Sequence, residues 1–590
     1  MASRKHHALT VLREMREHFG AEISEEDLGH QAAQVAEAVK RLTRSHELAQ
    51  ILRDPVGTGK TAVALTAARL LLDEGAVDYV LVIAPNSTVG DQWRKRAEPI
   101  FGERIAEGHD AWAKNKVVVG THKTGPSWRS PKPARSLVIV DEAHRGLQNE
   151  NSEAFQGVSA AAAGAKTLLV TATPYQLTTT GFTRMLGVSS GAAAPPDADL
   201  DLVRRYGQAT SKLLRRWEPD VDTSDIEPLI AEAERCRDKA AGVLSGRLLP
   251  VTGIRVPPAP APSPTILPLG DWAVPYTVAR VLPEMIGVGR TDAFQRSLAS
   301  SSETLTSSDR VVGRRIDELM ASGEPEVRAF LEQLVDRMGT GTDHPKVAAT
   351  VKWVKSQVAD GHHVVVFTSW LPTRDAIGQA LTEAGMEDVA APTGSTVAVA
   401  LERRFKADAE GRPVVLVLSD RFSESIDLDG GNPSIVHHDL TWNPIRLTQR
   451  WGRVVRIRTG FQPVPPDRIF LPILDVEVDH RLARVVTGRR DLAGLVVPES
   501  SELDADAWTM PDTILKRIAT NFAKQACGST RRPVSQPGNI LGRVRRDVAL
   551  LGEVARSVAP TAASFHSSRS RETCDDRHRT SPVPSPPATR

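Results

Sequence analysis

The sequence predicts an α/β protein with two tandem parallel-sheet domains, a helical insertion between them and a partly disordered C-terminal tail. Two observations predict this class. Short apolar runs alternate with helix-forming segments in two separate regions of the chain, which is typical of parallel sheets with helices on their faces. Between these regions, from about residue 191 to 344, strand-like runs give way to charged helical and proline-rich segments.

The first region begins with a helical lead-in and continues with four predicted strands. Residues 1–24 have an amphipathic helical pattern, and a second helix-period segment starts at Gly29. Apolar runs suited to strands buried on both faces then recur, with helices between them. They start at Tyr79, Lys116, Ser136 and Thr167.

A glycine-rich loop lies between an apolar stretch that ends at Leu52 and a helix-forming run. It reads DPVGTGKT over residues 54–61, and its strand–loop–helix context predicts a phosphate-binding loop, with a plain glycine turn as the alternative for this segment alone. Backbone N–H groups, a lysine and a hydroxyl would then contact the phosphates of ATP and Mg²⁺. The residues expected to do so are Gly57, Thr58, Gly59, Lys60 and Thr61.

Two adjacent acidic residues follow the predicted strand at 137–140. Asp141 and Glu142 stand at its carboxyl end, where ligands of parallel sheets bind. Asp141 can hold Mg²⁺, and Glu142 can orient and deprotonate the attacking water. A solvated turn is the alternative for an isolated acidic pair, but the phosphate loop upstream favours the metal site.

The segment QRWGRVVR at 449–456 places arginines three residues apart, so they share one face of a helix. Phosphoryl transfer needs positive charge at the transition state, and arginine from a second domain is a usual source. A solvated helix face is the alternative. The segment follows a second series of predicted strands, which favours a role at the ATP site. Those strands start at His362, Arg412 and Ser434.

Together these segments resemble the superfamily-2 helicases and translocases, specifically the Snf2/RapA-like group with a DEAH box. Within that group the chain looks most like bacterial phage-defence or restriction-type helicases. The resemblance covers about residues 25–495 and implies two RecA-like domains that use ATP with Mg²⁺. The segments that carry it are the loop at 54–61, DEAH at 141–144, TATP at 171–174, FQRSLASS at 294–301, DLTWNPIRLTQRWGRVVRI at 439–457 and DHRLARVVTGR at 479–489.

The resemblance also implies roles for individual residues. Trp93 and Trp442 are expected in the core rather than stacked on bases. For catalysis the resemblance implies Glu142, Gln449, Arg453 and Arg456, and for nucleotide binding it adds Gln31, in the place of the adenine-reading glutamine, and Asp427. For coupling it implies His144, Thr171, Thr173 and Glu424. For nucleic-acid contact it implies loops whose hydroxyls and amides suit phosphates, at Pro85, Thr121, Thr368 and Ser419.

One departure from the family pattern bears on activity. Residues 424–428 read ESIDL where the family has E-G-x-D-L, so Ser425 stands in the place of a glycine. A side chain there can crowd the domain interface or alter coupling. A non-hydrolysing scaffold subunit of a defence complex is therefore one alternative function.

Composition agrees with a multidomain cytoplasmic protein. The chain has 590 residues, 41% of them apolar, which suffices for several cores. Its net charge of +2 neither demands nor excludes nucleic acid, because motors bind through local patches. No signal peptide or membrane-spanning run is expected. No disulfide framework or zinc-ligand spacing is expected from Cys236, Cys527 and Cys574.

We expect the chain to divide into five segments, of which the insertion carries helical protrusions that grip the substrate. They are a helical lead-in at 1–24, a first RecA-like domain at 25–190, a helical insertion at 191–344, a second RecA-like domain at 345–495, and an extension at 496–590 whose end is disordered.

The leading hypothesis is an ATP-driven motor on double-stranded DNA, either a translocase or a helicase. Duplex DNA is then expected to stimulate its ATP hydrolysis. A helicase acting on RNA or single strands is the second hypothesis, and the scaffold subunit is the third. No nuclease or methyltransferase constellation is evident in the sequence. Any cutting or modification of DNA would therefore come from a partner protein, for example in a defence system.

Overall fold

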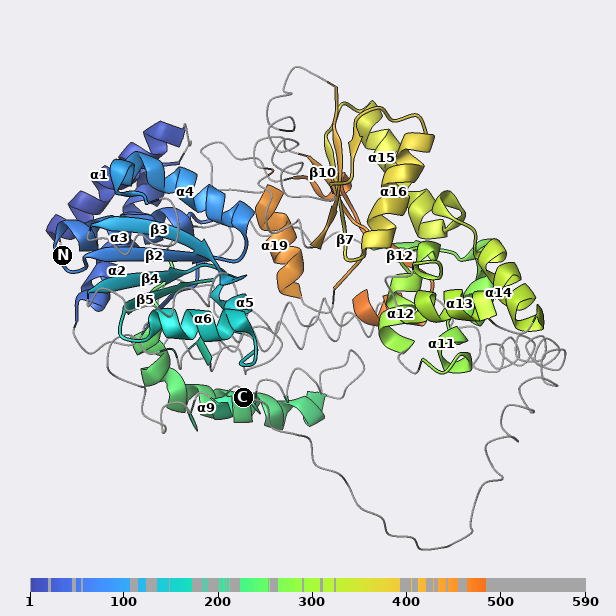
Figure 1. Cartoon of the computed structure of the whole chain (residues 1–590), viewed down its shortest axis with the longest axis horizontal. Helices are drawn as coiled ribbons and strands as arrows, with labels where there is room; N and C mark the ends of the chain where they lie inside the picture. Colours follow the sequence, from blue (N-terminus) through green and yellow to red (C-terminus); the bar gives the residue numbers. More distant parts are fainter. Residues whose placement is uncertain are drawn as a thin grey trace, which may run out of the picture.

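Figure 1 shows the computed structural model of the chain. The structure describes most of residues 2–483, and the predicted extension at 496–590 lies outside the described residues. Short breaks interrupt the described part in several places. The longer breaks are 45–48, 107–114, 124–134, 172–183, 189–200, 213–222, 255–263, 393–404, 406–411, 421–427, 429–432 and 455–463.

The first lobe, residues 2–171, is a parallel sheet with strand order β1-β5-β4-β2-β3. Its strands are β1 (Gln50–Leu52), β2 (Tyr79–Ala84), β3 (Lys116–Thr121), β4 (Ser136–Val140) and β5 (Lys166–Val170). Its helices are α1 (Ala2–Phe19), α2 (Glu25–Thr43), α3 (Lys60–Asp73), α4 (Ser87–Phe101), η1 (Gly102–Arg104), α5 (Ala143–Gly146) and α6 (Glu153–Ala162).

Each strand of the first lobe sends alternate side chains into two apolar layers. In β2, Val80 and Val82 pack with α1 to α4, whereas Leu81 and Ile83 pack with α5, α6 and α9 (Thr223–Arg247) on the other face. Figure 1 shows α6 and α9 on the side of the sheet opposite α1. Because helices cover both faces, every residue of β2 is buried, as the sequence predicts for a parallel sheet.

The second lobe, residues 345–470, repeats this arrangement with strand order β11-β10-β7-β9-β8, also parallel. Val364 and Val366 of β7 pack with α15 and α16, and Val365 and Phe367 pack toward α19. The elements are α15 (Pro345–Ala359), β7 (Val364–Thr368), α16 (Leu371–Glu383), β8 (Val389–Ala390), β9 (Val415–Ser419), β10 (Ser434–His437), α19 (Pro444–Val454), η6 (Pro466–Arg468) and β11 (Ile469–Phe470).

The segment between the lobes packs in two directions. Helix α9 contacts β1 of the first lobe. The later part of the segment contacts the residues that follow the second lobe. There β6 (Thr265–Leu267) pairs in parallel with β12 (Pro472–Leu474), and Trp272 packs in the same hydrophobic core as Leu474. The remaining elements are η3 (Gly270–Trp272), α10 (Ala273–Ala279), α11 (Leu282–Met285), α12 (Thr291–Leu298), η4 (Ser302–Thr304), α13 (Val311–Ser322), α14 (Pro325–Met338) and η5 (Gly341–Asp343). The five predicted segment boundaries stay predictions.

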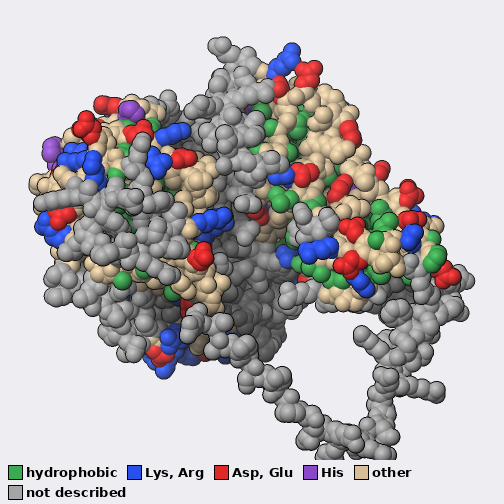
Figure 2. All heavy atoms as spheres, in the orientation of Figure 1, with side chains coloured by type: hydrophobic (Ala, Val, Ile, Leu, Met, Phe, Trp, Pro, Cys, Tyr) green, Lys and Arg blue, Asp and Glu red, His purple; other side chains and the backbone are tan. Residues whose placement is uncertain are grey.

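The predicted fold class is confirmed: two parallel α/β sheets stand in tandem with helices between them. None of the helices in the described part of the chain has the length and apolar character needed to cross a bilayer. On the face seen in Figure 2, acidic and basic side chains are interspersed over both lobes. This distribution agrees with the nearly balanced charge of the sequence.

A buried ion pair fastens the first turn of α15 to the chain beyond β12. Lys346 Nζ lies 2.9 Å from Asp479 Oδ2, which also accepts a hydrogen bond from the backbone N–H of Leu474. We expect Lys346→Met to lower the free energy of unfolding by about 3–5 kcal/mol, because it leaves a buried carboxylate without its partner. Urea denaturation followed by circular dichroism measures this.

The matched control is Arg412→Met, which breaks an ion pair of 2.7 Å whose side chains are 79% and 77% exposed. Its expected cost is below about 1 kcal/mol. The double variant Lys346→Met/Asp479→Leu should recover part of the loss. Equal costs for the buried and the exposed pair would contradict this account of the α15 junction.

Candidate functional site

The phosphate loop has the backbone shape that the sequence predicts. Gly57 and Gly59 have φ angles of 90° and 85°, in the left-handed region that favours glycine, and α3 starts directly afterwards at Lys60. Lys60 Nζ donates a 2.8 Å hydrogen bond to the carbonyl of Asp54 across the loop. Thr61 is half-buried in the first turn of α3. The loop therefore fits a polyphosphate at the start of a helix.

Gln31 of α2 lies against this loop. Its side chain is 1% exposed, and Nε2 donates a 2.9 Å hydrogen bond to the carbonyl of Thr58. Its Oε1 is buried and makes no hydrogen bond within the described residues. Gln31 is therefore not a residue of a solvated helix surface. Adenine recognition by Gln31 stays a prediction.

Asp54, which stands where the common pattern has glycine, ties three segments together. Its carboxylate is buried and accepts hydrogen bonds from Gln34 Nε2 of α2, from the backbone N–H of Thr252 (2.6 Å) and from the Thr252 hydroxyl (2.9 Å). Gln34 Nε2 also donates to the carbonyl of Pro250 (2.8 Å). The segment after α9 is therefore anchored directly to the phosphate loop.

Asp141 and Glu142 lie beyond the carboxyl end of β4, as predicted. Asp141 Oδ2 accepts a 2.7 Å hydrogen bond from the indole N–H of Trp93, and Oδ1 accepts one from the backbone N–H of Glu142 (2.9 Å). Burial and then the neighbouring Glu142 raise the pKa of Asp141 to about 6, while Trp93 and the charge of Lys60 oppose the rise. The site thus brings Lys60 within electrostatic reach of the proposed metal ligand.

His144 lies between Glu142 and Thr171, the residue after β5. Glu142 has a φ of 45°, rare for a residue with a side chain, and its Oε2 lies 3.4 Å from His144 Nδ1. The same nitrogen lies 3.0 Å from the hydroxyl of Thr171, the residue after β5. His122 supports this turn from the end of β3, because its Nε2 donates to the carbonyl of Asp141 (3.0 Å).

In the second lobe, Arg450 is an internal anchor rather than a surface residue. Its side chain is fully buried, with Nε donating to Asp420 Oδ1 (2.9 Å) and Nη1 to the carbonyl of Asp439 (2.7 Å). Arg453, one turn later, is half-buried. Figure 1 shows α19 on the side of the second lobe that faces the first. Arg453 therefore lies on the helix expected to meet the ATP site, and its catalytic role stays a prediction.

At two of the predicted nucleic-acid contacts the side-chain hydroxyl is buried, and the contacts themselves stay predictions. The Thr368 side chain is completely buried and its hydroxyl donates to Asp439 Oδ2, and the Ser419 side chain is 2% exposed. Neither hydroxyl can reach a phosphate in this conformation, because each strand end is packed inside the second lobe. In the first lobe, Pro85 and Thr121 are partly exposed at the ends of β2 and β3, which leaves their predicted role untouched.

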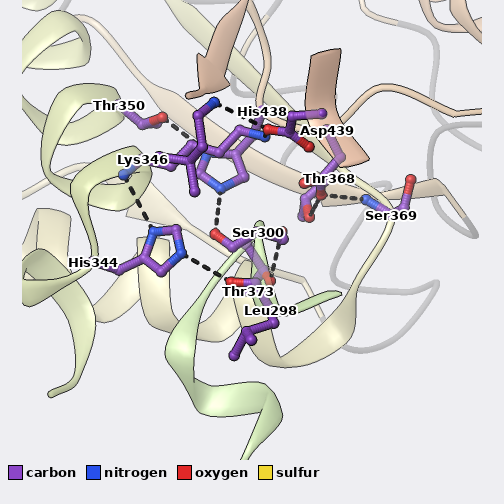
Figure 3. Close-up of polar contacts among 12 residues, drawn as sticks. Leu298, Ser300, His344, Lys346, Thr350, Thr368, Ser369, Thr373, His438 and Asp439 are labelled. Carbon is purple, nitrogen blue, oxygen red and sulfur yellow. Dashed lines mark hydrogen bonds and ion pairs between the residues drawn. The ribbon is translucent and has the colours of Figure 1, made fainter. Parts of the chain in front are cut away.

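Figure 3 shows the polar network that holds the ends of β7 and β10 against α15 and the segment after α12. His438 Nε2 donates to the carbonyl of Ser300 (2.9 Å), and its Nδ1 lies 2.8 Å from the hydroxyl of Thr350. The Ser300 hydroxyl lies 2.9 Å from that of Thr373 at the start of α16. Burial lowers the pKa of His438 to about 4, so the ring is neutral near pH 7. The serines of the 294–301 motif are therefore packing residues here.

Several predicted site residues lie outside the described part of the chain. For Gln449 the structure gives the position in α19 but not the side chain. The residues whose structure is not described are Thr173, Glu424, Ser425, Asp427, Trp442 and Arg456.

Sequence reasoning missed several groups at the site. Arg53, Gln34, His122 and Thr252 received no role, and Trp93 was assigned to the core without its bond to Asp141. Only Trp93 carried a signal, since a buried indole N–H needs an acceptor. The others depend on contacts between residues far apart in sequence.

The phosphate loop, the paired carboxylates and the parallel sheet of this chain are the features that define the class of P-loop ATPases. A family model described as "Type III restriction enzyme, res subunit" matches residues 26–176. A Bacillus subtilis (strain 168) protein described as "Uncharacterized ATP-dependent helicase YqhH" is 24% identical over 424 residues, which are 69% of each chain. These matches and the geometry of the site support a nucleic-acid-dependent ATPase of the helicase and translocase type.

Two solved structures are also similar in part. The Pyrococcus furiosus Hef helicase domain is 15% identical with a TM-score of 0.41, and the match covers 79% of this chain and 98% of that one. The Sulfolobus solfataricus SWI2/SNF2 ATPase core, solved in complex with dsDNA, is 14% identical with a TM-score of 0.28, over 81% and 95% of the two chains.

Gly59→Ala should abolish tight ATP binding. A Cβ at this position collides with Gln31 Nε2, and the φ of 85° disfavours any side chain. We expect the Kd for ATP to rise at least about tenfold, the equivalent of roughly 1.4 kcal/mol, as measured by equilibrium binding of a fluorescent ATP analogue. Gly29→Ala in α2 is the control, because a Cβ there meets no atom within 4 Å. An unchanged Kd for Gly59→Ala would show that the loop is not the ATP site.

The acid limb of the kcat/KM profile for ATP hydrolysis should lie near pH 6, because Asp141 must lose its proton before it can hold Mg²⁺. Trp93→Phe removes a hydrogen-bond donor that favours the ionised form of Asp141, so the pKa of Asp141 should rise. A hydrogen bond to a charged group contributes roughly 1.5–3 kcal/mol, so the acid limb should move up by about one pH unit. Trp353→Phe, which alters an indole stacked on Phe470, should leave the limb in place. A limb unmoved by Trp93→Phe would contradict this role of Trp93.

Proposed function

We propose that the chain is a Snf2-like translocase or helicase that couples ATP hydrolysis to movement on double-stranded DNA. One observation carries the proposal: His144 Nδ1 contacts both Glu142 Oε2 (3.4 Å) and the Thr171 hydroxyl (3.0 Å). The proposed water-activating carboxylate is thereby linked to the start of the TATP segment. A motor needs such a link, whereas a metabolic kinase does not.

The predicted site residues divide the chemistry of hydrolysis between them. Lys60 and the loop amides would hold the β- and γ-phosphates, and Thr61 and Asp141 would hold Mg²⁺, which neutralises charge on the phosphate oxygens when bound. Glu142 would accept the proton of the water that attacks the γ-phosphorus, and the bond to the ADP oxygen breaks. Arg453 and Arg456, with Gln449, would approach from the second lobe and stabilise the transferred group.

The described strand ends support a revised contact surface for DNA. In the first lobe, Pro85 directly follows β2 and precedes α4, Thr121 is the last residue of β3, and both are partly exposed. In the second lobe, backbone groups rather than the Thr368 and Ser419 hydroxyls would have to make the contact. Backbone contacts position a motor without reading sequence, as translocation along any DNA requires.

A role beside partner proteins in a restriction or phage-defence system is part of the proposal. It is supported by the restriction-subunit family model over residues 26–176 and by the DHRLARVVTGR segment at 479–489. The partner would supply nuclease or methyltransferase activity, and the protein would act in the cytoplasm.

The test is steady-state ATP hydrolysis by the full chain alone and with duplex DNA, single-stranded DNA or RNA, with Lys60→Ala as the background. We expect duplex DNA to raise kcat at least about tenfold, and we expect this rise to be lost in Lys60→Ala. Stronger stimulation by single strands or RNA would replace the translocase with a strand-separating helicase. ATP binding without turnover under every condition would leave the scaffold subunit.

A further inference from the structure

Arg53, directly after β1 and beside the phosphate loop, is a buried cation that the site described above does not use. Its side chain is only 4% exposed. Its Nε and Nη2 atoms are shielded from solvent and make no hydrogen bond within the described part of the chain. A guanidinium has five N–H donors and does not lose its charge in proteins. Such a group is costly to bury unless an anion meets it.

Among the residues that the structure describes, none forms an ion pair with Arg53. Asp54 is adjacent in sequence and its charge acts on Arg53, but its carboxylate is held by Gln34 and Thr252, as described above. The side chains of Ile51 and Leu52 belong to opposite apolar layers. By alternation Arg53 follows Ile51, toward the layer of α6 and α9, and Asp54 follows Leu52.

Two neighbours place Arg53 between the ATP site and the segment that follows α9. Leu52 pairs with Val170 of β5, and the backbone N–H of Thr171 donates to the Leu52 carbonyl (3.0 Å), so Arg53 lies beside Thr171. Thr171 is the residue that contacts His144. On the other side of β1, Leu248 forms a parallel bridge with Ile51. Tyr206, also buried, lies close enough to act on the Arg53 charge.

We propose that Arg53 is a phosphate-binding residue whose Nε and Nη2, which meet no acceptor among the described residues, receive a phosphate oxygen during the motor cycle. The proposal rests on the proposed function and adds to it a cation outside the phosphate loop and outside the 449–456 helix. The oxyanion comes from the γ-phosphoryl group of ATP or from the backbone of bound DNA. Arginine suits either, because its planar fork matches two phosphate oxygens.

A stability measurement separates this role from a structural one. Arg53→Met replaces an unpaired buried charge by an apolar chain of similar length, so the ligand-free protein should melt about 2–4 °C higher by differential scanning calorimetry. The matched control is Arg374→Met. Arg374 is equally buried at 4% exposure, but it donates to the Pro392 carbonyl (3.0 Å) and to Asp375, so its loss should lower the melting temperature.

Binding measurements identify the source of the phosphate. For ATP with Mg²⁺, measured by equilibrium dialysis, Arg53→Met should raise Kd about tenfold if the γ-phosphoryl group is the ligand. If a DNA phosphate is the ligand, Arg53→Met should instead raise the Kd for a labelled duplex, measured by fluorescence anisotropy. The slope of log K against the logarithm of the salt concentration should then fall in magnitude by about one. Arg53→Lys should keep part of the affinity in whichever arm responds.

The proposal is overturned if Arg53→Met melts lower, as Arg374→Met does, and binds ATP and duplex as the wild type does. If the wild type binds neither ligand, the proposed function has failed, and the melting temperature in inorganic phosphate then decides for Arg53. A phosphate-dependent rise in the wild type that is absent in Arg53→Met supports the site, and equal behaviour of the two rejects it. Should Arg53→Met fail to fold, the same comparison is made with Arg53→Lys.

Discussion

The hydrogen bonds of the buried Asp54 carboxylate are the constraint on which the site depends. They join α2, the phosphate loop and the segment that leaves α9 in one cluster. A glycine in this place could form none of them. The carboxylate therefore does two things at once: it fixes the loop against α2, where Gln31 contacts Thr58, and it fixes the start of the connector that leads toward the second lobe. The loop, α2 and the segment after α9 therefore share one anchoring residue.

The carboxylates beyond β4 depend on a second set of contacts, from residues distant in sequence. Trp93 of α4 and His122 after β3 hold the two sides of Asp141, and His144 connects Glu142 with Thr171 after β5. In the strand order β1-β5-β4, β5 lies between the phosphate-loop strand and the carboxylate strand. Thr171 is consequently adjacent to both, which explains why a hydroxyl at this position can respond to changes on either side.

The sequence predicted the parallel strands and the phosphate loop because local patterns determine them: continuous apolar runs, and glycines before a helix. It could not predict the Asp54–Thr252 contact, because those residues are brought together by α9 returning to the edge of β1. The burial of Thr368 was missed for a similar reason. A hydroxyl after a strand can face solvent or an internal acid, and only the position of Asp439 decides between them. A solvated helix face was the alternative for Arg450, but its side chain is buried because it donates a hydrogen bond to Asp420, directly after β9.

The contacts of Lys60 and Asp54 also show what ATP binding must change. Lys60 Nζ donates to the Asp54 carbonyl, within the same loop that Asp54 anchors through its carboxylate. An ammonium group that turns to the β- and γ-phosphates has to weaken or release that carbonyl. ATP binding therefore perturbs the residue that holds the connector, without any direct contact between nucleotide and connector. Because the carboxylate bonds to Thr252 are separate from the carbonyl bond to Lys60, the anchor itself can persist while the loop changes shape. The connector then remains attached to the moving part of the site.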